Sequence, residues 1–239
     1  MIRHPLATRL IRRVEAVTLA VIIVTAGALW AFVALASEML EGDLHAFDEA
    51  ILLALRNPDD PADPIGGGAV EIAMRDLTAL GGVTVLALIS LTVLSVLLLK
   101  RQSASALLLS AAISGGLAVS TVAKSTFSRP RPDLVPHGVD AATASFPSGH
   151  SMMAAVTYLT LAVMLTRIER QSAVRALYVA VAALVTILIG ASRVYMGVHW
   201  PSDVLAGWTL GAAWALGLWL LARHLARRGR IEPEEPCDA

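Results

Sequence analysis

The residues LTALGGVTVLALISLTVLSVLLL (77–99), followed by Lys100 and Arg101 and then by QSASALLLSAAISGGLAVSTVA (102–123), decide the fold class. Neither run contains a charged residue, and each is as long as the roughly 20 residues that a helix needs to cross the hydrocarbon core of a membrane. Only two basic residues separate the runs. The pattern therefore predicts two neighbouring transmembrane helices joined by a short loop.

Four further apolar runs of similar length lie on either side of this pair, at residues 16–37, 149–166, 176–192 and 204–222. The composition agrees, because 56% of the 239 residues are hydrophobic and only 16% are charged, which is too apolar for an ordinary soluble domain. We expect an all-α, polytopic membrane protein, a bundle of six transmembrane helices that forms a single domain over residues 1–239. The single Cys237 indicates neither a disulfide nor thiol chemistry.

The positive charges predict how the bundle is oriented. Thirteen of the 19 Lys and Arg residues lie near the two termini or in alternate loops, which places both termini and a polar tail at about 223–239 in the cytoplasm. The other six fall on the outer side, namely Arg56, Arg75, Lys124, Arg129, Arg131 and Arg193. Cations placed against this bias at helix ends indicate a bound anion. A formal net charge of +0 argues against nucleic acid as a partner.

The first apolar run and the outer segment after it each allow two interpretations. Basic residues precede the run at 16–37, as in a cleavable signal peptide, but the run is about twice as long as a signal-peptide core, so we expect a retained helix. Within residues 38–76, Phe47, Ile51 and Leu55 recur at helical spacing. They predict a short interfacial helix between the first two spans, acting as a lid or as a plain connector. We interpret residues 66–68, all glycine, as a hinge.

Three outer patches concentrate the polar residues, and the first surrounds the sequence SRPRP at 128–132. Pro130 and Pro132 restrict their own φ and bias the preceding residue towards extended conformations. Arg129 and Arg131 are therefore held on a stiff segment just after Lys124. Arginine presents a planar fork that matches phosphate oxygens, and lysine a compact point charge. The patch indicates either a phosphate site or a basic loop in contact with lipid headgroups.

The second patch is the sequence PSGH at 147–150, directly before an apolar run. The N–H groups and the dipole of a helix amino terminus favour an anion, and Gly149 lets the backbone approach it closely. Ser148 is able to cap the helix or to donate to phosphate. His150 ionises near neutral pH, which makes it a candidate to protonate a leaving oxygen. The alternative is a helix cap with an interfacial histidine.

The third patch holds Ser192, Arg193, His199 and Asp203, between the last two apolar runs. Pro201 suits the first turn of the final helix. The spacing predicts that the Asp203 carboxylate lies below the His199 imidazole on one helix face and holds one ring nitrogen as a donor. The other nitrogen is then free to attack phosphorus. The alternative is an ordinary helix cap at a membrane surface.

Together the three patches resemble the type 2 phosphatidic acid phosphatase superfamily, whose signature is KxxxxxxRP, then PSGH, then SRxxxxxHxxxD. Every position of that signature is present, in order, between residues 124 and 203. The resemblance implies that His199 is the nucleophile, that Asp203 orients it, and that His150 acts as general acid and then as base. It also implies that the phosphate is held by Lys124, Arg131, Ser148, Gly149 and Arg193. Arg129 lies outside the signature, so its role stays open.

The resemblance also implies the reaction, which is metal-independent hydrolysis of a lipid phosphate or diphosphate through a phosphohistidine, on the outer face of the plasma (inner) membrane. No cofactor is expected, and the sequence lacks the carboxylate cluster of a magnesium-dependent phosphatase. The candidate substrates are undecaprenyl diphosphate, phosphatidic acid and phosphatidylglycerol phosphate. We favour undecaprenyl diphosphate or a broad specificity, by analogy alone.

Two other classes of protein share some of these features. A transporter or channel for an anionic lipid or a small anion would also place cations at helix ends, but it would more often carry ionisable residues near mid-membrane, where the predicted spans have almost none. Soluble vanadate-dependent haloperoxidases belong to the same superfamily, and the hydrophobic spans argue against them. A lipid phosphatase is therefore the prediction, with the transporter or channel as its alternative.

Overall fold

The computed structural model describes residues 5–139 and 143–227, with side chains described for residues 15–139 and 143–225. Its elements, in chain order, are α1 (Pro5–Glu41), α2 (His45–Ala54), β1 (Arg56–Asn57), β2 (Asp60–Pro64), α3 (Gly67–Ala79), α4 (Val83–Leu99), α5 (Ser103–Phe127), α6 (Gly149–Ile168), α7 (Ser172–Tyr195) and α8 (Pro201–Arg227). Most of the polar tail expected at about 223–239 lies outside the described residues.

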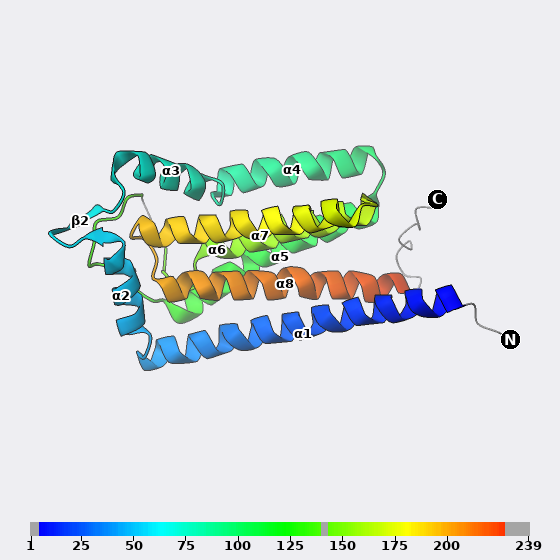
Figure 1. Cartoon of the computed structure of the whole chain (residues 1–239), viewed down its shortest axis with the longest axis horizontal. Helices are drawn as coiled ribbons and strands as arrows, with labels where there is room; N and C mark the ends of the chain where they lie inside the picture. Colours follow the sequence, from blue (N-terminus) through cyan, green and yellow to red (C-terminus); the bar gives the residue numbers. More distant parts are fainter. Residues whose placement is uncertain (1–4, 140–142, 228–239) are drawn as a thin grey trace.

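The long helices run side by side along the long axis of the molecule (Figure 1). α6 packs against α5, α7 and α8, and α1 packs along α8. Five helices, α1, α5, α6, α7 and α8, are each long and apolar enough to cross a membrane, and the bent pair of α3 and α4 brings the number within the described ranges to six. The predicted bundle of six apolar spans is therefore confirmed.

The second predicted span, residues 77–99, is not a straight helix. α3 and α4 meet at 45° across Gly81 and Gly82. A Cβ on Gly81 would lie 2.5 Å from Ile189 Cγ2 on α7 and 3.5 Å from His150 Cβ on α6, so a side chain would block this close approach. The prediction of one continuous helix is wrong. An uninterrupted apolar run shows that a segment is long enough to cross a membrane, but it does not show where the helix bends.

A short helix and a hairpin of two strands cover one end of the bundle (Figure 1). α2, which lies crosswise to α1, is the short helix predicted between the first two spans. After it, β1 and β2 pair antiparallel, which is an exception to the predicted all-α fold. The sequence patterns did not predict these strands because they are only 2 and 5 residues long. Gly66 and Gly67 then take positive φ values of 97° and 68°, so the expected hinge is a tight turn into α3.

Two of the three apolar residues that predicted α2, Phe47 and Ile51, do not face the bundle, whereas the third, Leu55, packs against the core. Phe47 and Ile51 are 44% and 37% exposed, whereas Asp48 and Leu52 are fully buried. Asp48 accepts hydrogen bonds from Ser202 at the start of α8. A carboxylate thus occupies a position at which an amphipathic helix normally places an apolar residue.

Glycines let α6 and α8 approach closely near the end that carries the predicted motifs. A Cβ on Gly207 would lie 2.7 Å from the carbonyl oxygen of Ser148, and one on Gly211 would lie 2.5 Å from that of Met152. Small residues allow such close packing between membrane helices. The first turn of α6 therefore lies beside the first turn of α8, which carries Asp203.

Candidate active site

Four helix termini meet at the end of the bundle that α2 and the hairpin cover (Figure 1). They are the last turn of α5, the first turn of α6, the last turn of α7 and the first turn of α8. The three polar patches of the sequence lie at these termini. Residues that are 68 and 74 positions apart in the chain consequently come within hydrogen-bonding distance, as Arg131 does with His199 and Arg129 with Asp203.

Ser148 caps the amino terminus of α6. Its Oγ accepts a long 3.5 Å hydrogen bond from the N–H of Ser151 and a 2.9 Å bond from the Ser151 hydroxyl. The N–H of Ser148 donates to the carbonyl oxygen of Asp203 at 2.9 Å, which ties the start of α6 to α8. At the next residue, a Cβ on Gly149 would lie 3.3 Å from Cε of Lys124. The lysine side chain thus packs directly against the positive end of the α6 dipole.

His199 lies in the connection between α7 and α8 and belongs to neither helix. Pro201 begins α8, and because a residue before proline is biased away from the helical region, the helix cannot easily extend back to His199. Asp203 lies in the first turn of α8 and accepts a 2.9 Å hydrogen bond from the N–H of Trp200. The two side chains do approach each other, but the predicted shared helix face is wrong.

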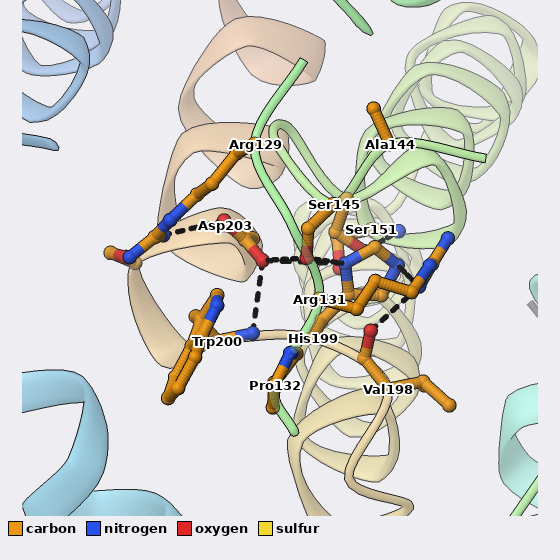
Figure 2. A network of polar contacts seen from close by, with 12 residues as sticks. Arg129, Arg131, Pro132, Ala144, Ser145, Ser151, Val198, His199, Trp200 and Asp203 are labelled. Carbon is orange, nitrogen blue, oxygen red and sulfur yellow. Dashed lines mark hydrogen bonds and ion pairs between the residues drawn. The ribbon is translucent and has the colours of Figure 1, made fainter. Parts of the chain in front are cut away.

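A serine hydroxyl joins His199 to Asp203 (Figure 2). The Ser145 hydroxyl donates a short hydrogen bond to Asp203 Oδ2, and its oxygen lies 3.3 Å from His199 Nδ1. The direct distance from Nδ1 to Oδ2 is 3.5 Å, longer than a good N–H···O hydrogen bond. All three residues are buried. The carboxylate therefore acts on the ring across this distance and also through Ser145.

The contacts of the His199 ring assign its tautomer. Arg131 Nη1 lies 3.2 Å from Nε2, and because a guanidinium has only donors, Nε2 is the acceptor. The ring proton then lies on Nδ1, facing Ser145 and Asp203. Burial lowers the pKa of His199 to about 4, so the ring is neutral at neutral pH. A neutral imidazole with a lone pair on Nε2 is chemically a nucleophile.

Backbone carbonyls hold two cations beside this ring, and Figure 2 shows one of them, Arg131, with the carbonyl oxygen of Val198. Arg131 donates to the carbonyl oxygen of Val198 at 2.6 Å and, through Nε, to that of Thr143 at 2.8 Å. Lys124 Nζ lies 2.5 Å from the carbonyl oxygen of Ala144. Carbonyl acceptors fix these side chains without neutralising them. Burial lowers the pKa of Arg131, yet an arginine keeps its proton in a protein, so its charge is available to an anion.

Arg193 and His150 complete the predicted group. Arg193 is buried and donates to Thr78 Oγ1 on α3 at 3.0 Å, while its Nε has no hydrogen-bond partner among the described residues. A buried guanidinium N–H without a partner is a donor suited to a bound anion. His150 lies within electrostatic reach of four charged or ionisable groups, Arg193, His199, Lys124 and Arg131. The predicted phosphate-binding and catalytic residues therefore lie close together at one end of the bundle.

Arg129, whose role the sequence left open, is directed away from Arg131 (Figure 2). Its Nη1 donates to Asp203 Oδ1 at 2.7 Å and to Ser202 Oγ at 2.8 Å. Its Nη2 donates to Asp48 Oδ2 at 2.8 Å. The two arginine side chains of the SRPRP segment thus point in different directions. Arg131 contacts the His199 imidazole, and Arg129 contacts the Asp203 carboxylate. Arg129 is engaged by two carboxylates and does not belong to the cation group around Nε2.

Sequence reasoning missed three members of this site, Ser145, Asp48 and Thr78. Ser145 stands two residues before Pro147, so its nearness to a motif was a usable signal. Asp48 and Thr78 lie in segments predicted as an interfacial helix and a membrane span, where nothing in the local pattern points to the site. Among the described residues, no group of three or more His, Cys, Asp or Glu side chains is arranged to hold a metal ion.

Comparisons with known proteins identify a family. The family model described as the PAP2 superfamily matches residues 103–227. Phosphatidylglycerophosphatase B of Bacillus subtilis is 42% identical over 91 residues, which are 38% of this chain and 44% of the relative. Undecaprenyl-diphosphatase of Sulfolobus acidocaldarius is 35% identical over 68 residues, 28% of this chain and 29% of the relative. The chain thus matches less than half the length of these two curated relatives.

A solved structure is similar over a much larger part of both chains. The crystal structure of a transmembrane PAP2 type phosphatidylglycerolphosphate phosphatase from Bacillus subtilis has a TM-score of 0.71 and 28% sequence identity, and the similarity covers 85% of this chain and 96% of that one. The sequence match to the family model includes all three motifs and more than half of the chain. This multi-pass membrane protein therefore belongs to the PAP2 superfamily.

Proposed function

We propose that this protein hydrolyses a phosphate or diphosphate ester of a membrane lipid through a phosphohistidine at His199, without a metal. The observation that carries the proposal is the neutral His199 ring, whose Nε2 faces Arg131 while its Nδ1 faces Ser145 and Asp203. Membership of the PAP2 superfamily supports the reaction class.

In this proposal the substrate phosphate binds in front of Nε2, where several donors and positive charges converge. Lys124, Arg131 and Arg193 supply charge, and the start of α6 supplies the hydroxyl of Ser148 and the N–H of Gly149. As charge redistributes over the equatorial oxygens in the transition state, groups already fixed in position need little reorganisation to stabilise it. The carbonyl contacts of Lys124 and Arg131 support this assignment, because they fix both cations before substrate binds.

The first chemical step transfers the phosphoryl group to His199. Arg131 Nη1 leaves Nε2 and turns to the substrate phosphate, and the Nε2 lone pair then forms a P–N bond while the bond from phosphorus to the lipid-side oxygen breaks. His150 gives a proton to that oxygen, so a monoester leaves as an alcohol and a diphosphate leaves as a monophosphate. The ring becomes positively charged, and the Asp203 carboxylate offsets that charge through Nδ1 and through Ser145.

The second step returns the enzyme to its starting state. His150, now neutral, takes a proton from a water molecule whose oxygen attacks phosphorus. The P–N bond breaks, its electron pair returns to Nε2, and inorganic phosphate leaves. His199 is then neutral and His150 holds the proton taken from water, which closes the cycle.

The membrane side and the lipid are proposed from charge and from analogy. α1 begins and α8 ends at the end of the bundle opposite the site (Figure 1). Because most Lys and Arg residues lie near the termini and in alternate loops, we place the site on the outer face. One relative is named phosphatidylglycerophosphatase B and another undecaprenyl-diphosphatase. We propose undecaprenyl diphosphate or a broad range of such lipids as the substrate.

A phosphate-release panel tests this function. Purified protein in detergent, with excess EDTA, is expected to release inorganic phosphate from undecaprenyl diphosphate, phosphatidylglycerol phosphate or phosphatidic acid. His199→Ala is expected to abolish release while keeping the thermal unfolding of the wild type. His224→Ala, at an exposed histidine near the far end of α8, is the matched control and should retain full activity.

Three outcomes would contradict the proposal. The first is turnover of His199→Ala close to that of the wild type. The second is activity that EDTA removes and magnesium restores. The third is movement of the lipid or of an anion across reconstituted vesicles without any hydrolysis, which would favour the transporter or channel.

A further inference from the structure

Asp48 is a fully buried charge that the proposed reaction does not use. It lies on the inward face of α2, outside all three motifs of the sequence. A buried carboxylate is unfavourable unless it is paired and hydrogen-bonded. Its partners therefore indicate what it does.

Both carboxylate oxygens of Asp48 are engaged with the start of α8. Oδ1 accepts a 2.8 Å hydrogen bond from the N–H of Ser202, and Oδ2 accepts a 2.6 Å bond from the Ser202 hydroxyl. Asp48 thus satisfies a backbone donor in the first turn of α8, as a capping residue would, although it is 154 positions away in the sequence. The helix that it holds is the one that carries Asp203.

Arg129 connects Asp48 to the carboxylate beside His199. Its Nη2 lies 2.8 Å from Asp48 Oδ2 and its Nη1 lies 2.7 Å from Asp203 Oδ1. Both carboxylate side chains are 0% exposed and the Arg129 side chain is 12% exposed, so solvent screens these charges only weakly. Two carboxylates share one guanidinium. The cluster of Asp48, Arg129 and Asp203 therefore has one net negative charge next to the His199 ring.

We propose that Asp48 is a positioning residue that shares Arg129, so that Asp203 keeps its negative charge for His199. This inference rests on the proposed function, in which the ring becomes positively charged when Nε2 bonds phosphorus. Without Asp48, Arg129 would pair with Asp203 alone, and the cluster would have no net charge. With Asp48, the cluster's one negative charge matches the positive charge that the ring acquires.

A merely structural role for Asp48 makes different predictions. Loss of a structural contact would lower the unfolding temperature and would weaken phosphate binding and turnover together. It would do so whichever residue stood at position 203. A role through Asp203 lowers kcat selectively, and it disappears when position 203 carries no charge.

Asp48→Asn is the first test, because Asn Oδ1 is still able to accept from the N–H of Ser202 but brings no charge. Its kcat is expected to fall about 10- to 100-fold, the effect of weakening one buried interaction with a charged group. The KM for the lipid and the Ki for inorganic phosphate should change by less than about threefold. Glu49→Gln is the matched control on the same helix, since Glu49 pairs with His45 at the surface, and its kcat should stay within about twofold of the wild type.

The second test combines Asp48→Asn with Asp203→Asn. In the Asp203→Asn background, Asp48→Asn is expected to lower kcat by less than about twofold, because the charge that Asp48 protects is already gone. A loss in this background equal to that in the wild type would overturn the proposal. So would a wild-type kcat in the Asp48→Asn single variant.

If Asp48→Asn fails to fold, the double variant Asp48→Asn with Arg129→Gln decides the question. It removes both charges of the pair and leaves Asp203 with its own, so kcat should lie within about tenfold of the wild type. A folded, phosphate-binding double variant that loses more than about tenfold in kcat would overturn the charge balance. No phosphate release by the wild type, or full release by His199→Ala, would refute the proposed function, a result distinct from all of these.

Discussion

Ser145→Ala is the substitution whose effect follows most directly from the site geometry. The Ser145 oxygen lies 3.3 Å from His199 Nδ1, whereas Asp203 Oδ2 lies 3.5 Å from the same nitrogen. Removing the hydroxyl leaves Nδ1–H with only the longer contact at the step of the proposed reaction in which the ring becomes positively charged. A hydrogen bond to a charged group contributes about 1.5–3 kcal/mol, which corresponds to a loss in kcat of about 10- to 150-fold.

Asp203 keeps its bonds from Trp200 N–H and Arg129 in this variant, so the fold should survive. The assay is phosphate release at saturating lipid, with KM and the Ki for inorganic phosphate measured alongside; both should change by less than about threefold. Ser90→Ala is the control, because Ser90 is also a buried serine, but it lies on α4 and its hydroxyl has no hydrogen-bond partner within the described part of the chain. A kcat for Ser145→Ala within about twofold of the wild type would refute the assigned bridge.

Two further predictions concern the same ring. Asp203→Asn should lower kcat by more than about 100-fold with little change in the Ki for inorganic phosphate; unchanged turnover would mean that the carboxylate does not orient the nucleophile. Because burial lowers the pKa of His199 to about 4, the ring stays neutral as the pH falls from 7 and becomes protonated only near pH 4. Quenched-flow rates of phosphohistidine formation should therefore show no loss from His199 protonation near pH 6.5, the usual histidine pKa; an acid limb there would contradict the burial argument.

The number of spans, and the helix ends that carry the candidate site residues, could be predicted from the sequence because both depend on local patterns. Uncharged runs such as residues 102–123 have the length of a membrane crossing whatever their neighbours are. The short helix after the first span was also visible in the spacing of Phe47 and Ile51. Its orientation was not, since those residues are exposed and Asp48 faces the bundle.

The convergence of the three motifs could be anticipated because each lies at a helix end on the same predicted side of the membrane. Lys124, Gly149 and His199 do lie at one end of the bundle. The detailed contacts could not be anticipated. The carboxylate of Asp203 was expected below the ring on one helix face, but Pro201 starts the helix after His199, so Ser145 bridges the two side chains.

The features that sequence reasoning missed depend on contacts between distant segments. The 45° bend at Gly81 and Gly82 lies inside an uninterrupted apolar run, at the point where Gly81 closely approaches Ile189 on α7 and His150 on α6. Asp48 and Arg129 are 81 positions apart, so neither residue shows by itself that it has a charged partner. A single sequence records which residues are polar, but only the packed helices show which of them meet.

The most direct test of the central claim is to find where the phosphoryl group is attached during turnover. Protein supplied with a radiolabelled lipid phosphate should, when quenched in alkali, carry an acid-labile label on the peptide that contains His199, and His199→Ala should carry none. Label on another residue, or phosphate release by the wild type with no labelled protein at any quench time, would contradict the account.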